Sequence, residues 1–460
     1  MSFRRTWGAN ILNRFVRQYS NRNVLKLHER GMFEDIFPEI SSNEVTDLLN
    51  AKPQCVYAGF DPTASSLHLG NLLVLVNLLH WQRGGHKVIA LVGGATGRIG
   101  DPSGHATDRP ELQSTIINSN VRSIKESIQR IFSNHEQYLW DKYASTRTLT
   151  SPMIIDNADW YSEQNVVKFV SHVGRHFRLG TMLSRHSVQS RLSSEAGMSF
   201  AEFCYQVFQA YDWLHLLQRY DCRFQVGGSD QMGNIVSGHD LISRVADTRV
   251  YGLTLPLVTT ESGHKFGKTA DNAVWLNADK SSPFDLYQFF VRCQDSEVER
   301  LLKLFTFETL GSIENIMRKH QRNPELRTAQ KRLAEQVMLL VHGEEGLEAA
   351  LKATSALYDQ TAESLAQLTA EEISNIFQGA KICDLLLQPG TTTLELSLQA
   401  GCFTNERDAV RIISAGGFYI NYQRVTKIDE VLTQAAHILP NNITLIRVGK
   451  KNYYVVRWLK

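Results

Sequence analysis

Hydrophobic and polar residues follow a strand–helix–strand pattern in the first quarter of the chain. A short apolar run at 55–60 ends in turn residues, and a β-branched run at 88–92 stops at two glycines. Between them lies a predicted helix at 69–82 whose apolar residues fill most of its surface, so we expect that helix to be buried. This succession predicts two parallel strands joined by a crossover helix. Ligands of such sheets bind at the carboxyl ends of the strands, where the glycines and aspartates of this chain gather.

The rest of the chain changes its pattern twice. Further strands are predicted at 153–156 and 224–226, with largely helical sequence between them. From 283 to 378 the pattern is helical, residues 388–391 have the composition of a linker, and the remainder favours short strands and turns. We therefore predict an α/β protein made of a leader at 1–22, a parallel-sheet domain with a helical insertion at 23–278, a helical domain at 279–386 and a small α+β domain at 387–460.

The composition is that of an ordinary globular protein. The 460 residues are 43% hydrophobic and 21% charged, and their number exceeds what one compact core accommodates. No apolar run approaches the roughly 18 residues of a membrane-spanning helix, so we expect no membrane partner. The net charge of +2 means that a nucleic acid would have to be met by local basic patches. The six cysteines form no C-x-x-C pair, which argues against a disulfide framework and a zinc site, and we expect neither a protein-bound metal nor an organic cofactor.

The N-terminus has the composition of a mitochondrial transit peptide. No acidic residue precedes Glu29, apolar residues recur at helical spacing between 11 and 16, and the segment 17–20 resembles a matrix-processing site with cleavage after Tyr19. The basic residues of this region are Arg4, Arg5, Arg14, Arg17, Arg22 and Lys26. We therefore expect import into the mitochondrial matrix. The alternative is a basic tail that contacts RNA directly.

The first motif with chemical content is His68-Leu-Gly70-Asn71, at the start of the predicted buried helix. A helix N-terminus offers unpaired N–H groups and the positive end of a dipole, which suits phosphate. His68 and Asn71 lie on one face of the helix, and Gly70 leaves room for a flat base against the backbone. Taken alone, the motif is weak, because a capped core helix would have the same pattern.

The second motif is Lys265-Phe-Gly-Lys268-Thr269, in a loop bracketed by glycines. Two lysines and a hydroxyl could clamp polyphosphate charge as it grows in a transition state. A solvated basic turn is the alternative for this loop in isolation. The segment is one residue too short for a Walker A loop and lacks the strand-to-helix context, so it is not a P-loop.

Together the two motifs resemble the HIGH and KMSKS signatures of class I aminoacyl-tRNA synthetases. Other segments resemble the tyrosyl members of that family, and the match runs in order from about residue 25 to the C-terminus. These segments are Tyr57-Ala-Gly-Phe-Asp61-Pro-Thr63, Gly93 to Gly104, Tyr205-Gln-Val-Phe-Gln209-Ala-Tyr-Asp212 and Gly227-Gly-Ser-Asp230-Gln231. The resemblance implies a Rossmann-type catalytic domain, a helical anticodon-binding domain and a small RNA-binding domain.

The resemblance also implies the reaction and its residues. Tyrosine would be activated by ATP, which travels with Mg²⁺, and then passed to the terminal adenosine of tRNA(Tyr). Tyr57 and Asp212 would hydrogen-bond the substrate phenol, and a phenylalanine would leave those groups unpaired. The resemblance implies that the ammonium of tyrosine is bound by Asp101, Tyr205 and Gln209, and that Gln231 lies near the carboxylate. It implies ATP contacts at Asp61, Thr63, His68, Gly70, Asn71, Gly228, Asp230 and Lys268. It implies catalytic roles for His68, Lys265, Lys268, Thr269 and Thr63. The substrate carboxylate is itself the nucleophile, so catalysis rests on positioning and charge stabilisation.

The chain departs from the commonest family pattern at a few positions. Asn71 stands where a second histidine is usual and keeps a hydrogen-bonding group. His105 stands where lysine or arginine is frequent, which puts one cationic contact in doubt, although Arg109 could replace it. Ala58 replaces a polar or thiol-bearing residue, and we expect it only to tune ATP affinity.

The last segment, 390–460, contains nine basic residues and five acidic ones. The basic residues are Arg407, Arg411, Arg424, Lys427, Arg447, Lys450, Lys451, Arg457 and Lys460. A basic helix at 404–417 and aromatic strands at 418–422 and 453–456 are similar to the RNA-binding module of bacterial-type tyrosyl synthetases. The alternative is a basic solvated face on a β-rich cap.

The resemblance further implies a homodimer, with Phe200 and the apolar residues between 198 and 203 near the interface. These residues would otherwise be plain core. Tryptophan specificity on the same fold is one rival, which Tyr57, Asp212 and the C-terminal segment disfavour. An RNA-binding protein derived from a synthetase is the other, and both intact signatures argue against it.

Overall fold

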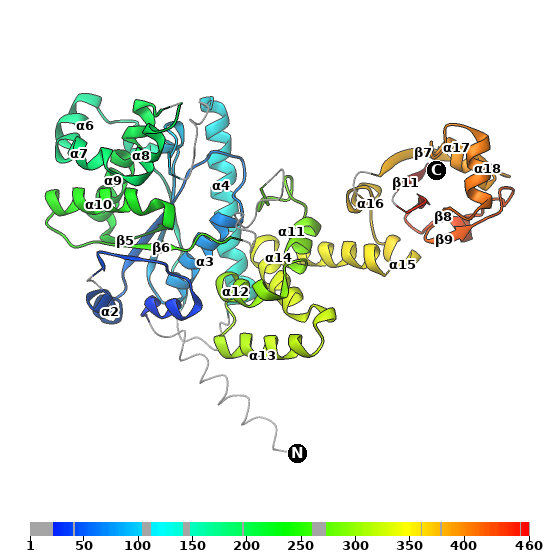
Figure 1. Ribbon diagram of the computed structural model, residues 1–460, viewed down its shortest axis with the longest axis horizontal. Coiled ribbons are helices and arrows are strands. Elements are labelled where there is room, and N and C mark those ends of the chain that lie inside the picture. Colours follow the sequence, from blue (N-terminus) through cyan, green and yellow to red (C-terminus); the bar gives the residue numbers. More distant parts are fainter. Residues whose placement is uncertain are drawn as a thin grey trace, which may run out of the picture. The chain divides into compact units, whose positions relative to one another are not determined.

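The computed structural model describes residues 22–39, 42–103, 112–140, 148–195, 197–259, 273–359, 361–377, 380–450 and 452–459 (Figure 1). The chain divides into two compact units. The first unit comprises the described residues up to Ser282 together with Phe289–Gly343, and the second comprises Pro283–Gln288 and Glu344–Lys460.

A six-stranded sheet forms the centre of the first unit. Its order is β1-β6-β5-β2-β3-β4, and every neighbouring pair is parallel except β1 with β6. The strands are β1 (Ile36–Phe37), β2 (Cys55–Phe60), β3 (Lys87–Val92), β4 (Met153–Asp156), β5 (Cys222–Gly228) and β6 (Tyr251–Leu255). The predicted strands at 55–60, 88–92, 153–156 and 224–226 are confirmed, and β1 and β6 were not predicted. The carboxyl ends of β2, β3 and β5 therefore meet at one edge of the sheet.

Helices cover both faces of this sheet. Figure 1 shows α9 (Phe200–Tyr220) and α10 (Met232–Val245) on one side and α3 (Leu69–Arg83) and α4 (Ser114–Asn134) on the other. The predicted helix at 69–82 is confirmed as α3, and it is apolar on nearly all sides because α12 (Asp295–Phe305) packs on it opposite the sheet. The smaller helices and turns of this part are η1 (Val24–Arg30), α2 (Ser42–Ala51), η3 (Thr96–Arg98), η4 (His135–Leu139), α5 (Ala158–Tyr161), α6 (Val166–His172), η5 (Gly174–His176), α7 (Leu179–Leu183), α8 (His186–Leu192) and η6 (Ser229–Gln231).

The segment predicted to be helical, 283–378, is helical in the structure. It contains α11 (Pro283–Val291), α12, α13 (Leu310–Arg322), η7 (Pro324–Leu326), α14 (Thr328–Tyr358), α15 (Ala362–Leu365) and α16 (Ala370–Ile376). Helix α14 is interrupted at Gly343, whose φ of 71° is in the left-handed region, and the two units divide there.

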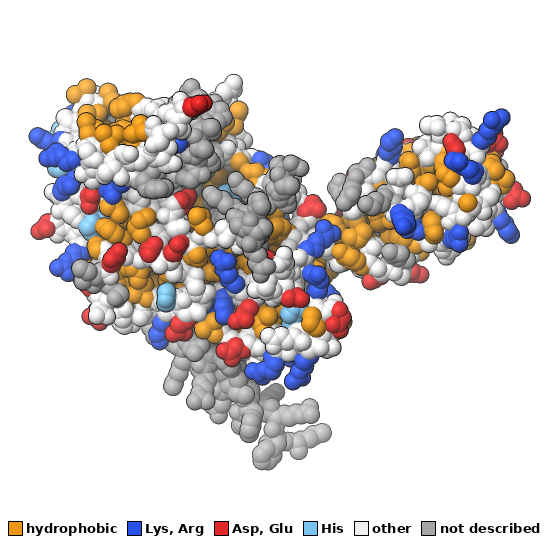
Figure 2. All heavy atoms as spheres, viewed as in Figure 1, with side chains coloured by type: hydrophobic (Ala, Val, Ile, Leu, Met, Phe, Trp, Pro, Cys, Tyr) orange, Lys and Arg blue, Asp and Glu red, His pale blue; other side chains and the backbone are white. Residues whose placement is uncertain are grey.

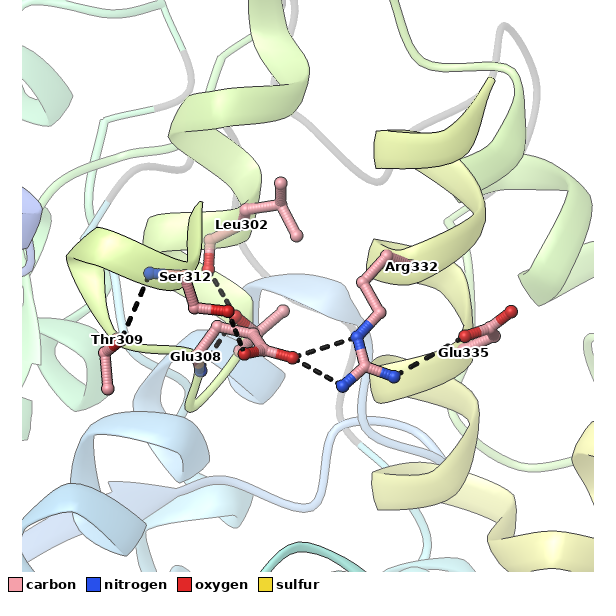
Figure 3. Close-up of polar contacts among 7 residues, drawn as sticks. Leu302, Glu308, Thr309, Ser312, Arg332 and Glu335 are labelled. Atoms are coloured by element: carbon pink, nitrogen blue, oxygen red, sulfur yellow. Dashed lines mark hydrogen bonds and ion pairs between the residues drawn. The ribbon is translucent and has the colours of Figure 1, made fainter. Parts of the chain in front are cut away.

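A carboxylate fastens the junction of α12 and α13 to α14 within the first unit (Figure 3). Glu308 accepts a hydrogen bond from Ser312 Oγ at 2.7 Å and one from Arg332 Nε at 2.9 Å. The hydroxyl of Thr309 caps α13 by accepting from the backbone N–H of Ser312. One acidic side chain thus joins the start of α13 to the neighbouring helix.

The second unit contains a five-stranded sheet in the order β7-β11-β10-β8-β9. Its strands are β7 (Lys381–Leu386), β8 (Phe418–Ile420), β9 (Gln423–Val425), β10 (Ile443–Val448) and β11 (Asn452–Leu459), and its short helices include α17 (Thr393–Gln399), α18 (Glu406–Ser414) and α19 (Gln434–His437). Because β7 pairs in parallel with β11, the C-terminal sheet starts before the predicted linker at 388–391. The three predicted domains differ from the two compact units, and their boundaries stay a prediction. Among the described helices of both units, none is both long and apolar enough to cross a membrane.

Candidate active site

A cavity of about 440 Å³ lies at the carboxyl edge of the main sheet, where β2 and β5 end and α3 begins. It is lined by every predicted site residue that the structure describes. These residues are Tyr57, Asp61, Thr63, His68, Gly70, Asn71, Asp101, Tyr205, Gln209, Asp212, Gly228, Asp230 and Gln231. The other predicted site residues, Lys265, Lys268 and Thr269, lie outside the described residues, as do His105 and Arg109. Residues from widely separated parts of the sequence thus meet in one place.

Two of the polar side chains that line the cavity, Tyr57 and Asp212, are buried. Asp212 accepts hydrogen bonds from Asn157 Nδ2 and Trp160 Nε1, both at 3.0 Å. The Tyr57 hydroxyl is buried and has no hydrogen-bond partner among the described residues. An orphaned buried hydroxyl is costly, and a polar ligand atom could satisfy it.

The ionisation of these groups is set by burial. Burial raises the pKa of Asp212 from 3.8 to about 7, although hydrogen bonds from Asn157 and Trp160 act to lower it. Burial, followed by the charge of Asp212, raises the pKa of the Tyr57 phenol well above its usual value. The phenol therefore stays protonated and can donate, while Asp212 titrates near neutral pH.

A chain of hydrogen bonds runs from Asp212 towards the middle of the cavity. Asn157 Nδ2 also donates to Thr96 Oγ1 at 3.0 Å, and Thr96 donates to Asp61 Oδ1 at 2.7 Å. The other carboxylate oxygen of Asp61 accepts from the Tyr205 hydroxyl at 2.8 Å. Burial and the neighbouring Asp61 carboxylate raise the pKa of Tyr205, so it remains a donor. These hydrogen bonds therefore fix side chains from the turns after β2 and β4, from η3 and from α9 relative to one another.

A second cluster of polar side chains surrounds Asp101. Gln231 Nε2 donates to Asp101 Oδ2 at 2.6 Å, and Gln231 Oε1 accepts from Gln209 at 3.3 Å and from Asn234 at 3.1 Å. Asn234 also reaches Asp101 Oδ1 at 3.4 Å. Carboxylate and amide oxygens are the acceptors that an ammonium group requires, so this cluster suits the amino group of an amino acid.

His68 is the N-cap of α3 and forms a capping box with Asn71. The ring Nδ1 accepts from the N–H of Gly70 at 3.1 Å and of Asn71 at 3.4 Å, and Asn71 Oδ1 accepts from the His68 N–H. The expectation that these helix N–H groups are unpaired and available to phosphate is therefore wrong, because the imidazole already satisfies them. Since Nδ1 is an acceptor, a neutral ring carries its proton on Nε2.

Glycines allow the polar side chains around the cavity to approach the backbone. A Cβ at Gly70 would lie 2.9 Å from Cε1 of His68, and one at Gly228 would lie 2.5 Å from Asp230 Oδ1. Thr63 is exposed in the turn after β2. The space that the missing side chain of Gly70 leaves is therefore also needed by His68, whose ring caps α3.

Comparison with known proteins identifies the family. The model of "tRNA synthetases class I (W and Y)" matches residues 49–359 of this chain. The chain belongs to the class I tRNA synthetases. A second model, "Tyrosine--tRNA ligase SYY-like C-terminal domain", matches residues 372–456. The predicted family and fold class are confirmed.

Individual relatives agree with the family models. The mitochondrial tyrosine–tRNA ligase of Drosophila melanogaster is 57% identical over 450 residues, which cover 98% of this chain and 97% of that protein. The mitochondrial enzyme of the same name from Homo sapiens is 48% identical, with 94% and 91% covered. The crystal structure of a C-terminally truncated Aspergillus nidulans mitochondrial tyrosyl-tRNA synthetase superposes with a TM-score of 0.67 at 32% identity, covering 76% of this chain and 99% of that one.

Some residues of this synthetase site were not singled out in the sequence. They are Thr96, Asn157, Trp160 and Asn234, which hold the predicted side chains in place. Asn157 and Trp160 directly follow the predicted strand at 153–156, so their place at the carboxyl edge of the sheet was a usable signal. Asn234 lies one helical turn after Gln231 and gave no such signal.

Proposed function

We propose that this chain activates tyrosine with ATP and transfers it to tRNA(Tyr) in the mitochondrial matrix. The observation that carries the proposal is the buried pair that lines the cavity, the orphaned Tyr57 hydroxyl and Asp212. The phenol of a bound tyrosine would give Tyr57 its missing partner and would donate to Asp212. Phenylalanine would leave the Tyr57 hydroxyl without a partner and would give Asp212 no donor beyond Asn157 and Trp160, and the indole of tryptophan would bring its N–H on a larger ring.

The amino acid is held at its other end by the cluster around Asp101. The ammonium binds among Asp101, Gln209 and Tyr205, and Gln231 lies next to it towards the carboxylate. The Tyr205 hydroxyl is engaged with Asp61, so Tyr205 acts partly by orienting that carboxylate. Tyrosine would thereby be held at its phenol and at its ammonium group.

Adenylate formation then needs no protein nucleophile. ATP enters with Mg²⁺ as part of the substrate, and an oxygen of the tyrosine carboxylate attacks the α-phosphorus as the bond to pyrophosphate breaks. Asp61, Thr63, Gly70, Asn71, Gly228 and Asp230 hold the nucleotide, and His68, Lys265, Lys268 and Thr269 stabilise the leaving pyrophosphate. A hydroxyl of the terminal adenosine of tRNA next attacks the acyl carbon, and AMP leaves.

The second unit contributes tRNA binding. The guanidinium of Arg447 lies over the ring of Tyr419 in β8, with its central carbon 3.8 Å from the ring centroid, so a cation and an aromatic ring are adjacent here. The basic surface is smaller than the sequence suggested, since Arg411 pairs with Asp408 at 2.7 Å and Arg457 with Asp384 at 2.7 Å. The remaining exposed cations of this unit, including Arg407 and Lys427, meet phosphates of the RNA.

The active form is a homodimer. Apolar side chains are exposed on α6, α7 and the first residue of α9, and Figure 2 shows hydrophobic side chains gathered over α6 and α7. Val166 and Val167 are each 71% exposed and Phe200 is 80% exposed. Phe200 is thus not a core residue of the single chain, and a second copy would cover such surfaces.

The place of action is the mitochondrial matrix. The two animal relatives described above carry the word mitochondrial in their names. The predicted transit peptide at 1–22 lies almost entirely outside the described residues, so it rests on its acid-free basic composition.

The proposal is tested by ATP–pyrophosphate exchange with the full chain, run separately with tyrosine, phenylalanine and tryptophan. We expect exchange with tyrosine alone, and Tyr57→Phe should narrow the preference for tyrosine over phenylalanine by about tenfold or more, since one hydrogen-bonding group is lost. Exchange with tryptophan would overturn the specificity. A folded chain that binds tRNA without any exchange would favour the RNA-binding rival.

A further inference from the structure

The segment that carries His68 is paired with a segment far along the chain. Residues 66–69 lie antiparallel to 274–277, with a bridge between His68 and Trp275. The N–H of Leu69 donates to the Val274 carbonyl at 3.2 Å, and the N–H of Leu276 donates to the Leu67 carbonyl at 2.8 Å. The position of the His68 backbone is therefore set by the place of this second segment.

Asn277 fixes the end of that segment with every hydrogen-bonding group it has. Its backbone N–H donates to Ser66 Oγ at 3.0 Å, and its Nδ2 donates to the Ser65 carbonyl at 3.1 Å and to Ser123 Oγ at 3.0 Å. Its Oδ1 accepts from Ser127 Oγ at 2.7 Å and from Arg130 at 3.1 Å. A side chain with both amide ends filled is held in one orientation.

Helix α4 supplies a rigid base for these contacts. Its buried face includes Ile117, Ile124 and Ile128, so the helix is fixed by packing. From this helix Ser123 also donates to the Ser65 carbonyl at 2.7 Å, and Asn120 donates to the Pro62 carbonyl at 3.0 Å. These hydrogen bonds hold the turn between β2 and α3 against α4. Asn277, the last residue of the segment 274–277, attaches that segment to the same helix. Asn277 itself does not line the cavity.

We propose that Asn277 is a positioning residue for adenylate formation, acting through the N-cap residue His68. This inference rests on the proposed function and deepens it, because it assigns a role to a residue that no substrate touches. Loss of the Asn277 side chain would remove the donor to the Ser65 carbonyl and to Ser123 Oγ, and would leave Ser127 and Arg130 without this acceptor. The paired segments 66–69 and 274–277 would then lose this attachment to α4. His68 would then be displaced from the leaving pyrophosphate while the tyrosine pocket stays intact.

The decisive experiment is a double-mutant cycle between Asn277 and His68, with the rate of adenylate formation and the KM for tyrosine as readouts. We expect Asn277→Ala to slow adenylate formation by about tenfold or more without raising the KM for tyrosine, since small misplacements of a catalytic group are expensive. In a His68→Ala background the same change should cost less than about twofold, because the group through which it acts is gone.

Two further variants separate positioning from general damage. Asn277→Asp keeps the acceptor for Ser127 and Arg130 but puts an oxygen in place of the donor that lies 3.1 Å from the Ser65 carbonyl, so it should slow adenylate formation about as much as Asn277→Ala. Asn134→Ala is the matched control, because Asn134 is an asparagine on α4 whose side chain likewise donates to a distant carbonyl, that of Leu340, at 3.1 Å. It should lower stability without slowing adenylate formation.

Several outcomes would overturn the inference. Equal losses from Asn277→Ala in both backgrounds would mean that it does not act through His68. An Asn277→Asp variant with the parent rate would show that the donor to Ser65 does not position His68, and an Asn134→Ala variant as slow as Asn277→Ala would assign the effect to folding. If Asn277→Ala does not fold, the cycle is run with Ser127→Ala, which removes one of the donors to Asn277. A parent chain that shows no exchange with tyrosine would instead refute the proposed function.

Discussion

At the scale of the residue, Asp212 is proposed to bind the phenol of tyrosine, while its burial disfavours the charged carboxylate. Burial raises the pKa of its carboxyl to about 7, whereas the ordinary value is 3.8. Between these two pH values the folded chain holds a proton that the unfolded chain has released. The free energy of unfolding that this group contributes therefore falls as the pH rises through that window, by at most about 4 kcal/mol.

Asp212→Asn removes this titration and gives a test of it. We expect the free energy of unfolding of the variant, minus that of the parent chain, to rise by about 2–3 kcal/mol between pH 5 and pH 8. Urea unfolding at the two pH values measures the difference. The buried histidines His80 and His135, whose pKa values are lowered by burial, titrate alike in both chains and cancel. A difference that does not change with pH would show that the Asp212 pKa is near its ordinary value.

At the scale of the element, the glycines after β3 let two loops come together. A Cβ at Gly93 would overlap with the Asp61 carboxylate and the Thr96 hydroxyl. Gly93→Ala should therefore reduce stability by about 1–3 kcal/mol and displace Asp61, slowing pyrophosphate exchange. Gly311→Ala on α13 is the matched control, because nothing lies within 4 Å of its Cβ and alanine favours the helix. Similar stability and exchange rates in the two variants would contradict the close approach at Gly93.

The elements with a strong local signal could be predicted from the sequence. The run 55–60 and the buried helix α3 have a clear period and clear turn residues, and both are where the sequence placed them. Strand β6 was missed because it is a five-residue run with Gly252 inside it, and it is held in place by β5 and β1. Strand β7 was missed because its residues are largely exposed and it depends on β11.

The candidate site also has a part that could be predicted from the sequence and a part that could not. The residues that gather at the cavity followed from family motifs, together with the rule that ligands bind at the carboxyl ends of parallel strands. The hydrogen bonds between them did not follow, because Asn157 reaches Asp212 from 55 residues away in the sequence. The same holds for the histidine cap of α3, whose geometry decides which N–H groups are satisfied.

At the scale of the whole molecule, the second unit contains the cations proposed to bind RNA, and the first unit contains an exposed apolar surface. The net charge of +2 gives no strong field over the chain, and two arginines of the second unit, Arg411 and Arg457, are already paired with carboxylates. RNA binding must then rely on the cations that remain, each near a phosphate, and will weaken steeply with salt. The exposed apolar side chains of α6, α7 and Phe200 belong to the first unit.

Assembly can be tested at Phe200, whose exposed aromatic ring is suited to the centre of an interface. In the proposed dimer, Phe200→Asp would bury two like charges across the two-fold axis, so we expect its dissociation constant to rise by about 100-fold or more. Sedimentation velocity over a range of concentrations measures it. Leu326→Asp is the matched control, since Leu326 is also an exposed apolar residue of the first unit, at 52% exposure, and should leave the dimer unchanged. A parent chain that is monomeric at micromolar concentration, or a Phe200→Asp variant that assembles as well as the control, would rule out this surface as the interface.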